Sequence, residues 1–134
     1  MKVVIDTNIF VSSFFGGKPK KIIELWSKGE IIICVSPSIL DEYFDVLTRA
    51  GLKNKKNTDE ILALFSHGFN SLYISKTPHL QIIKDDPDDD KFIECAIALN
   101  SNIIISGDKH LLHIKKYLNI EVYSPHAFLD TFFK

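Results

Sequence analysis

The stretch Asp85-Asp86-Pro87-Asp88-Asp89-Asp90 places five carboxylates within six residues and passes directly into an apolar helical pattern. This pattern predicts a helix over Pro87–Asn100, and the β-branched segment Asn102–Ser106 that follows it predicts a buried strand. Apolar strands that alternate with helices are typical of a parallel sheet covered on both faces.

The same alternation extends along the rest of the chain. Further strands are predicted at residues 2–5, 30–35, 72–74 and 121–123. Further helices are predicted at residues 9–15, 19–27, 37–49, 58–69, 109–118 and 125–132, with a polar loop at 51–57. Ser36-Pro37 and Ser124-Pro125 each supply an N-cap serine followed by proline at the first helical position. The prediction is a three-layer α/β/α sandwich with a central, mostly parallel sheet, in one domain of residues 1–134.

Length and composition agree with one globular domain. The chain has 134 residues, of which 46% are apolar and 25% charged. No apolar run reaches the about 20 residues that span a bilayer. The N-terminus begins as a strand without a leader-like apolar region, which indicates a cytoplasmic protein. Cys34 and Cys95 lie in apolar stretches and are expected to be buried, reduced thiols.

The charge balance gives little evidence of a nucleic-acid partner. The net charge is −1, and fifteen of the sixteen basic residues are lysines, so base readout by arginine is nearly absent. Two lysine groups are either solvated surface or contacts for an RNA backbone. They are Lys18, Lys20 and Lys21, and Lys53, Lys55 and Lys56.

Acidic residues occur where the predicted strands end. Asp6 and Asp108 directly follow strands, and Glu42 lies in the second turn of a helix that follows one. Because the carboxyl ends of parallel strands meet at one edge of a sheet, these acids and the aspartate run are expected to converge. Oxygen-rich clusters without Cys or His suit Mg²⁺ or Mn²⁺.

Each acid also has a purely structural interpretation. Asp6 and Asp108 could be N-caps, and part of the aspartate run could complement a helix dipole. Glu42 could be a solvated position, and a helical wheel does not separate it from Asp41. At about 100° per residue, Asp88 and Asp89 border the apolar face of their helix, whereas Asp90 points away from that face.

Four ordered motifs resemble the PIN domain, closest to VapC-like toxin components of toxin–antitoxin pairs. The resemblance spans nearly the whole chain. The motifs are Val4-Ile5-Asp6-Thr7-Asn8, Ser36-Pro37-Ser38-Ile39-Leu40-Asp41-Glu42, Asp86-Pro87-Asp88-Asp89 running into Phe92-Ile93-Glu94-Cys95-Ala96, and Ser106-Gly107-Asp108 followed by Leu111-Leu112.

The resemblance implies a catalytic, metal-binding site and supporting residues. The implied acids are Asp6, Glu42, Asp89 and Asp108, with Asp88 or Asp90 as substitutes at the third position. The implied supporting side chains are Thr7, Asn8 and Ser106. The resemblance thereby selects Glu42 over Asp41. It further implies an Mg²⁺- or Mn²⁺-dependent endoribonuclease that forms homodimers and binds an antitoxin protein.

Three other interpretations compete. A haloacid-type phosphotransfer hydrolase needs a second aspartate two residues after the first, where this chain has Asn8. A receiver needs an aspartate at the end of a middle strand, where this chain has Val35-Ser36. A non-catalytic interaction module with the same fold is disfavoured because all four acids are present.

A zinc site is not predicted. His110 and His113 lie one helical turn apart, but no acid or Cys completes a tetrahedral set of ligands.

Overall fold

A computed structural model of the chain describes residues 1–49, 59, 63, 65–68, 70–83 and 87–134. Its centre is a six-stranded sheet of order β3-β2-β1-β4-β6-β5, in which every neighbouring pair except β5–β6 is parallel. The strands are β1 (Lys2–Ile5), β2 (Ile32–Val35), β3 (Ser71–Tyr73), β4 (Ile103–Ile105), β5 (Lys116–Tyr117) and β6 (Ile120–Tyr123).

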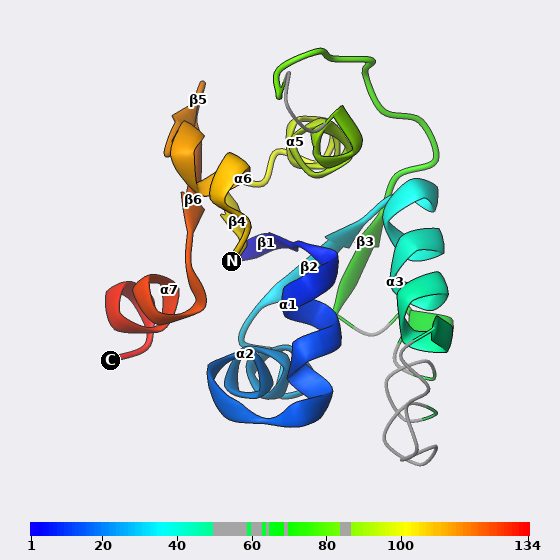
Figure 1. The fold of residues 1–134 in the computed structure, drawn as a ribbon. Helices are drawn as coiled ribbons and strands as arrows, with labels where there is room; N and C mark the ends of the chain where they lie inside the picture. The colour runs from blue at the N-terminus through cyan, green and yellow to red at the C-terminus, as the bar shows by residue number, and fades with distance from the viewer. Residues whose placement is uncertain (50–58, 60–62, 64, 69, 84–86) are drawn as a thin grey trace.

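Helices cover both faces of this sheet (Figure 1). The chain forms α1 (Thr7–Ser12), a 3₁₀ turn η1 (Ser13–Phe15), α2 (Gly17–Ser27), α3 (Pro37–Arg49), a second turn η2 (Pro87–Asp89), α5 (Asp90–Ala98), α6 (Lys109–Ile114) and α7 (Pro125–Phe132). Helices α5 and α6 lie on one side, and α1, α2 and α7 on the other, with α3 packed against α1. The predicted three-layer, mostly parallel α/β architecture is confirmed.

The strand order places a topological switch point between β1 and β4. From β1 the chain moves outward to β2 and β3, then returns to the opposite side of β1 as β4. Ile5 is in register with Ile105, so Asp6 and Ser106 leave the sheet side by side. Crevices at such points, beyond the carboxyl ends of the strands, are where open α/β sheets bind ligands.

A cluster of aromatic side chains fixes α1 against α3. The rings of Phe10 and Tyr43 stack with centroids 4.1 Å apart, and Phe65 packs against both. The Tyr43 hydroxyl donates a hydrogen bond to the carbonyl of Ile5. Since Tyr43 is fully buried, this contact anchors the helix that carries Glu42 to the end of β1.

The helix predicted from Lys109 ends earlier than expected, at Ile114, and its second half is a strand. Lys115 adopts φ 59°, and Lys116–Tyr117 pairs antiparallel with β6. The Val122 amide donates to the Lys115 carbonyl at 2.9 Å, so the hairpin satisfies backbone groups that a helix would otherwise satisfy. The predicted loop at 51–57 and most of the predicted helix at 58–69 lie outside the described residues.

Candidate functional site

Asp6 lies at the carboxyl end of β1 and is 3% exposed. One carboxylate oxygen, Oδ1, accepts the Ile9 amide at 2.8 Å and so caps α1. The other oxygen, Oδ2, accepts a hydrogen bond from the Ser106 hydroxyl, which follows β4. Asp6 can therefore cap α1 and contact Ser106 across the switch point at the same time, because the two roles use different oxygens.

The environment of Asp6 disfavours its ionised form. Burial raises the pKa of the Asp6 carboxyl, and the negative charge of Asp108 raises it further. Hydrogen bonds from Ser106 and from the amides of Ile9 and Gly107 lower the pKa and offset only part of this effect. A bound cation would remove the repulsion between the two acids.

Asp108 is joined to Asp6 through Ser106. The Ser106 Oγ donates to Asp6 and accepts the Asp108 amide at 2.9 Å. Asp108 Oδ1 caps α6 by accepting the amides of His110 at 2.8 Å and Leu111 at 3.3 Å. One serine thus fixes the relative position of two acids from opposite sides of the switch point.

Glu42, in α3, contacts the first turn of α1 next to Asp6. The Thr7 hydroxyl, in the first turn of α1, donates to Glu42 Oε1. The Lys91 ammonium, from the first turn of α5, lies 2.5 Å from Glu42 Oε2. The neighbouring Asp41 is exposed, so the structure distinguishes two acids that the helical wheel left equivalent.

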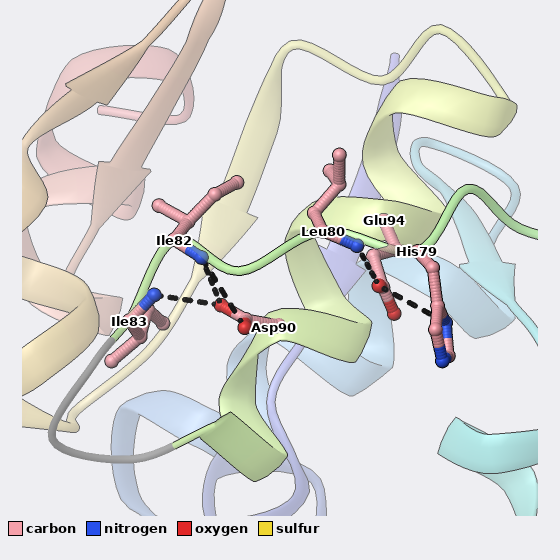
Figure 2. A network of polar contacts seen from close by, with 6 residues as sticks. All are labelled: His79, Leu80, Ile82, Ile83, Asp90 and Glu94. Atoms are coloured by element: carbon pink, nitrogen blue, oxygen red, sulfur yellow. Dashed lines mark hydrogen bonds and ion pairs between the residues drawn. The ribbon is translucent and has the colours of Figure 1, made fainter.

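The three aspartates at the start of α5 have different environments. Asp88 is exposed, Asp89 is half-buried and Asp90 is buried. Asp90 accepts the Ile83 amide at 2.8 Å and the Ile82 amide at 3.3 Å (Figure 2). Both contacts of Asp90 are therefore with a neighbouring backbone segment, which makes Asp89 the better candidate of the two for a site residue.

No sequence pattern indicated that residues 79–83 would pack along α5, on the side that carries Asp90 and Glu94. Glu94, one turn beyond Asp90, accepts the Leu80 amide at 2.7 Å, and its Oε2 lies 3.9 Å from His79 Nδ1. Figure 2 shows Asp90 and Glu94 side by side beneath the extended segment. An i, i+4 pair of acids on a helix is a weak sequence signal, because solvated faces carry the same spacing.

The remaining sequence candidates have different outcomes. Asn8 is exposed in α1, and Lys18, Lys20 and Lys21 are exposed in α2, whereas Lys53, Lys55 and Lys56 lie outside the described residues.

The two cysteines are buried and reduced, as predicted. Burial raises the pKa of the Cys34 thiol to about 11 and that of the Cys95 thiol to about 12. His110 Nδ1 is buried 3.7 Å from Asp108 Oδ1, while His113 is exposed.

The oxygen atoms around Asp6 are of the type that binds a hard cation, but in the described residues they do not lie close enough together to coordinate one. Carboxylate and hydroxyl oxygens from Asp6, Glu42, Asp108, Thr7 and Ser106 are the ligand type of Mg²⁺ or Mn²⁺. Among the residues that the structure describes, no three acidic, His or Cys side chains lie close enough together to hold a metal ion as they stand. Side-chain rearrangement around Glu42 would be required for an ion to bind.

The fold and this group of carboxylates at a switch point define a class, the α/β proteins with an acidic site beyond the sheet. Residues 2–110 match the family model of the PIN domain, so the chain belongs to the PIN domain family. The uncharacterized protein MJ1680 of Methanocaldococcus jannaschii is 37% identical over 148 aligned positions, which cover 100% of this chain and 93% of that protein.

A similar fold occurs in a solved structure, the VapBC2 complex of Rickettsia felis bound to a DNA fragment from its promoter. The match has a TM-score of 0.56 and 18% identity, and covers 92% of this chain and 98% of that chain. Identity this low supports likeness of fold alone. Within the described part of the chain, no helix is both long and apolar enough to cross a membrane.

Proposed function

We propose that this protein is a divalent-metal-dependent endoribonuclease and the toxin of a toxin–antitoxin pair. The observation that carries the proposal is the Ser106 bridge between Asp6 and Asp108 at the switch point, with Glu42 held beside Asp6 through Thr7. Family membership supports nuclease activity, because PIN domains are generally nucleases. The likeness to a VapBC complex supports the narrower assignment as a toxin.

Asp6, Glu42, Asp89 and Asp108 would hold the metal, Mg²⁺ or Mn²⁺. When bound, the ion supplies Lewis acidity for hydrolysis of a phosphodiester bond. Ser106 fixes the orientation of Asp6 and the backbone of Asp108, and Thr7 fixes one oxygen of Glu42. We expect the amide of Asn8, which is exposed in the first turn of α1, to donate a hydrogen bond to an RNA phosphate.

The test is cleavage of single-stranded RNA with and without Mn²⁺ or Mg²⁺, for wild type, Asp6→Asn and Asp41→Asn. Asp6→Asn is expected to retain less than about one hundredth of the activity, because even residues that orient metal ligands contribute 10- to 100-fold. Asp41→Asn is the matched control, since Asp41 is exposed beside Glu42, and it should cleave like wild type. Equal, metal-independent cleavage by all three proteins would refute the proposal.

The partners follow from the same assignment. We propose a homodimer and an antitoxin protein that blocks the site. Light scattering after gel filtration should give about twice the 15.3 kDa chain mass. Co-expression with the product of an adjacent gene should relieve the growth arrest that the chain alone causes in cells. A monomeric mass contradicts the dimer only, and the absence of growth arrest contradicts the toxin role.

A non-catalytic module with the PIN fold is the second candidate. The absence, in the described residues, of three ligands at coordination distance favours it. Such a module would bind RNA but neither cleave it nor gain stability from metal. Melting with and without millimolar Mn²⁺ separates the two candidates, because only a specific site raises the melting temperature by mass action.

A further inference from the structure

Lys91 differs from almost every other lysine of the described chain because its side chain is enclosed. Among the described lysines, only Lys2 and Lys91 are not exposed, and the Lys91 side chain is 15% exposed. Lys2 has a structural partner, the carbonyl of Leu99 at 3.1 Å. The partner of Lys91 is instead Glu42, one of the acids of the proposed site, at 2.5 Å.

The contact joins two helices that meet at the site. Lys91 lies in the first turn of α5, and Glu42 lies in α3, which packs against α5. Thr7 donates to one oxygen of Glu42, and Lys91 occupies the other. Both oxygens of this carboxylate therefore already have a partner. The Lys91 ammonium lies where a metal cation bound to Oε2 would lie.

The surrounding charges give a reason for a positive group here. Asp6 and Asp108 repel each other, and the negative charges of Asp6 and Glu42 both act on the buried hydroxyl of Tyr43. Asp6 and Glu42 therefore belong to one electrostatic environment. Asp6 is buried, and a buried carboxylate near other acids destabilises the fold unless a cation lies nearby.

We propose that the Lys91 ammonium is a built-in counter-ion of this site, which holds Glu42 in the metal-free protein and releases it to the divalent cation when metal binds. The inference rests on the proposed metal site. It also accounts for the absence of a preformed set of ligands among the described residues, because Glu42 is engaged by Lys91 instead of being aimed at an ion.

The experiment is calorimetric titration of Mn²⁺ into wild type, Lys91→Met and Lys134→Met, with melting curves in EDTA. Lys91→Met keeps an apolar stem but removes the charge that competes with the metal. It should bind Mn²⁺ on the order of tenfold more tightly, because a unit charge a few ångström away couples at least this strongly near a protein surface. Lys134→Met removes the same charge from an exposed pair with Asp130 and should bind like wild type.

Stability provides a second readout. In EDTA, Lys91→Met should melt below wild type, because Glu42 loses its counter-ion, and Mn²⁺ should raise its melting temperature more than it raises that of wild type. A merely structural lysine would lower the melting temperature without tightening metal binding. If Lys91→Met does not fold, Lys91→Gln carries the same expectation, since it keeps an uncharged donor for Glu42.

The outcomes separate this inference from the proposed function. The counter-ion role is overturned if wild type binds Mn²⁺ and neither Lys91→Met nor Lys91→Gln binds it more tightly. The proposed metal site is unaffected by that result. Failure of every variant to bind Mn²⁺ overturns both. Tighter binding by Lys91→Met, with Lys134→Met unchanged, supports the exchange.

Discussion

Asp6 combines two roles that are often treated as alternatives. Its Oδ1 caps α1, while its Oδ2 faces Ser106 across the switch point. Burial raises the pKa of this carboxyl because water is excluded and Asp108 is near. An acid that stabilises its helix through one oxygen thus carries an electrostatic cost through its charge.

This cost predicts a pH-dependent effect of Asp6→Asn in EDTA. The pKa of Asp6 in the folded protein lies above its ordinary value of 3.8, so between the two values the folded state binds more protons. The wild-type free energy of unfolding therefore rises as pH falls through that window. Asparagine caps a helix as well as aspartate does, so at pH 8 the variant should be more stable than wild type.

Urea unfolding from pH 8 to pH 4 measures this difference. The advantage of Asp6→Asn should shrink as pH falls through the raised pKa of the wild-type carboxyl. Ser106 contacts the same carboxylate but has no titrating group, so Ser106→Ala serves as the control for lost hydrogen bonding. An advantage of Asp6→Asn that is constant with pH contradicts the assigned cause.

Single residues also show where sequence reasoning reaches its limit. The positions of Asp6 and Asp108 follow from strand ends and could be predicted. Helical periodicity could not separate Glu42 from Asp41, because both border the same apolar stripe. The resemblance to the PIN domain selected Glu42, and in the structure Thr7 and Lys91 contact this residue. Such contacts join residues far apart in the chain, and local periodicity carries no information about them.

At the scale of elements, the acidic run has two separate functions within one helix start. Asp90 and Glu94 accept hydrogen bonds from the backbone of residues 80–83, whereas Asp89 is half-buried and is the residue proposed for the metal site. Helical periodicity predicts the helix and turns Asp90 away from its apolar face, yet Asp90 is buried beneath the segment of residues 82–83. The extended segment has no periodic pattern, so its position over α5 could not be predicted.

Asp90→Ala is expected to lower the free energy of unfolding by about 2 to 3 kcal/mol. The change leaves the buried Ile83 amide without its charged acceptor, and an unsatisfied buried group carries a cost of this size. Asp88→Ala is the matched control two positions away. Asp88 is exposed, so its loss should change stability by less than about 0.5 kcal/mol.

Chemical denaturation of both variants measures the difference, and hydrogen exchange should show faster exchange at residues 80–83 in Asp90→Ala alone. Equal stability of the two variants would mean that the contacts of Asp90 contribute nothing net. The result would then also remove the reason for excluding Asp90 from the site.

The β5–β6 hairpin gives a prediction about backbone strain. Lys, Tyr and Leu at 116–118 suit a helix by local preference, yet Leu118 adopts φ 51° in the turn and is exposed. A left-handed backbone conformation has a steric cost for leucine that glycine, which lacks a Cβ atom, does not have. Leu118→Gly should therefore raise the free energy of unfolding, by about 0.5 kcal/mol.

Leu118→Ala is its control, since alanine removes the same side chain but keeps the strain of a positive φ. Thermal melting should rank the glycine variant above wild type and the alanine variant at or below it. Glycine below alanine would indicate that the turn is not formed in solution.

At the scale of the whole molecule, the site joins parts of the fold that are otherwise independent. Asp6 and Asp108 come from the two strands at the switch point, Glu42 from a helix on one face of the sheet, and Lys91 from a helix on the other. The order of strands and helices follows from hydrophobic patterning. The convergence of these acids follows from the parallel topology, which is why it could be predicted before their contacts were known.

Metal binding should consequently connect these elements. Addition of Mn²⁺ is expected to slow amide hydrogen exchange at residues 6–10, 40–43, 89–92 and 106–111 together, because an ion shared by their side chains suppresses the local openings of each segment. Helix α7 is the internal control. It packs on α2 and β6, contributes no residue to the site, and should exchange at the same rate with and without metal. Protection of one segment alone would indicate an ion held by a single acid. Equal protection of α7 would indicate a general rise in stability without a shared site, because only a shared ion slows the four segments and leaves α7 unchanged.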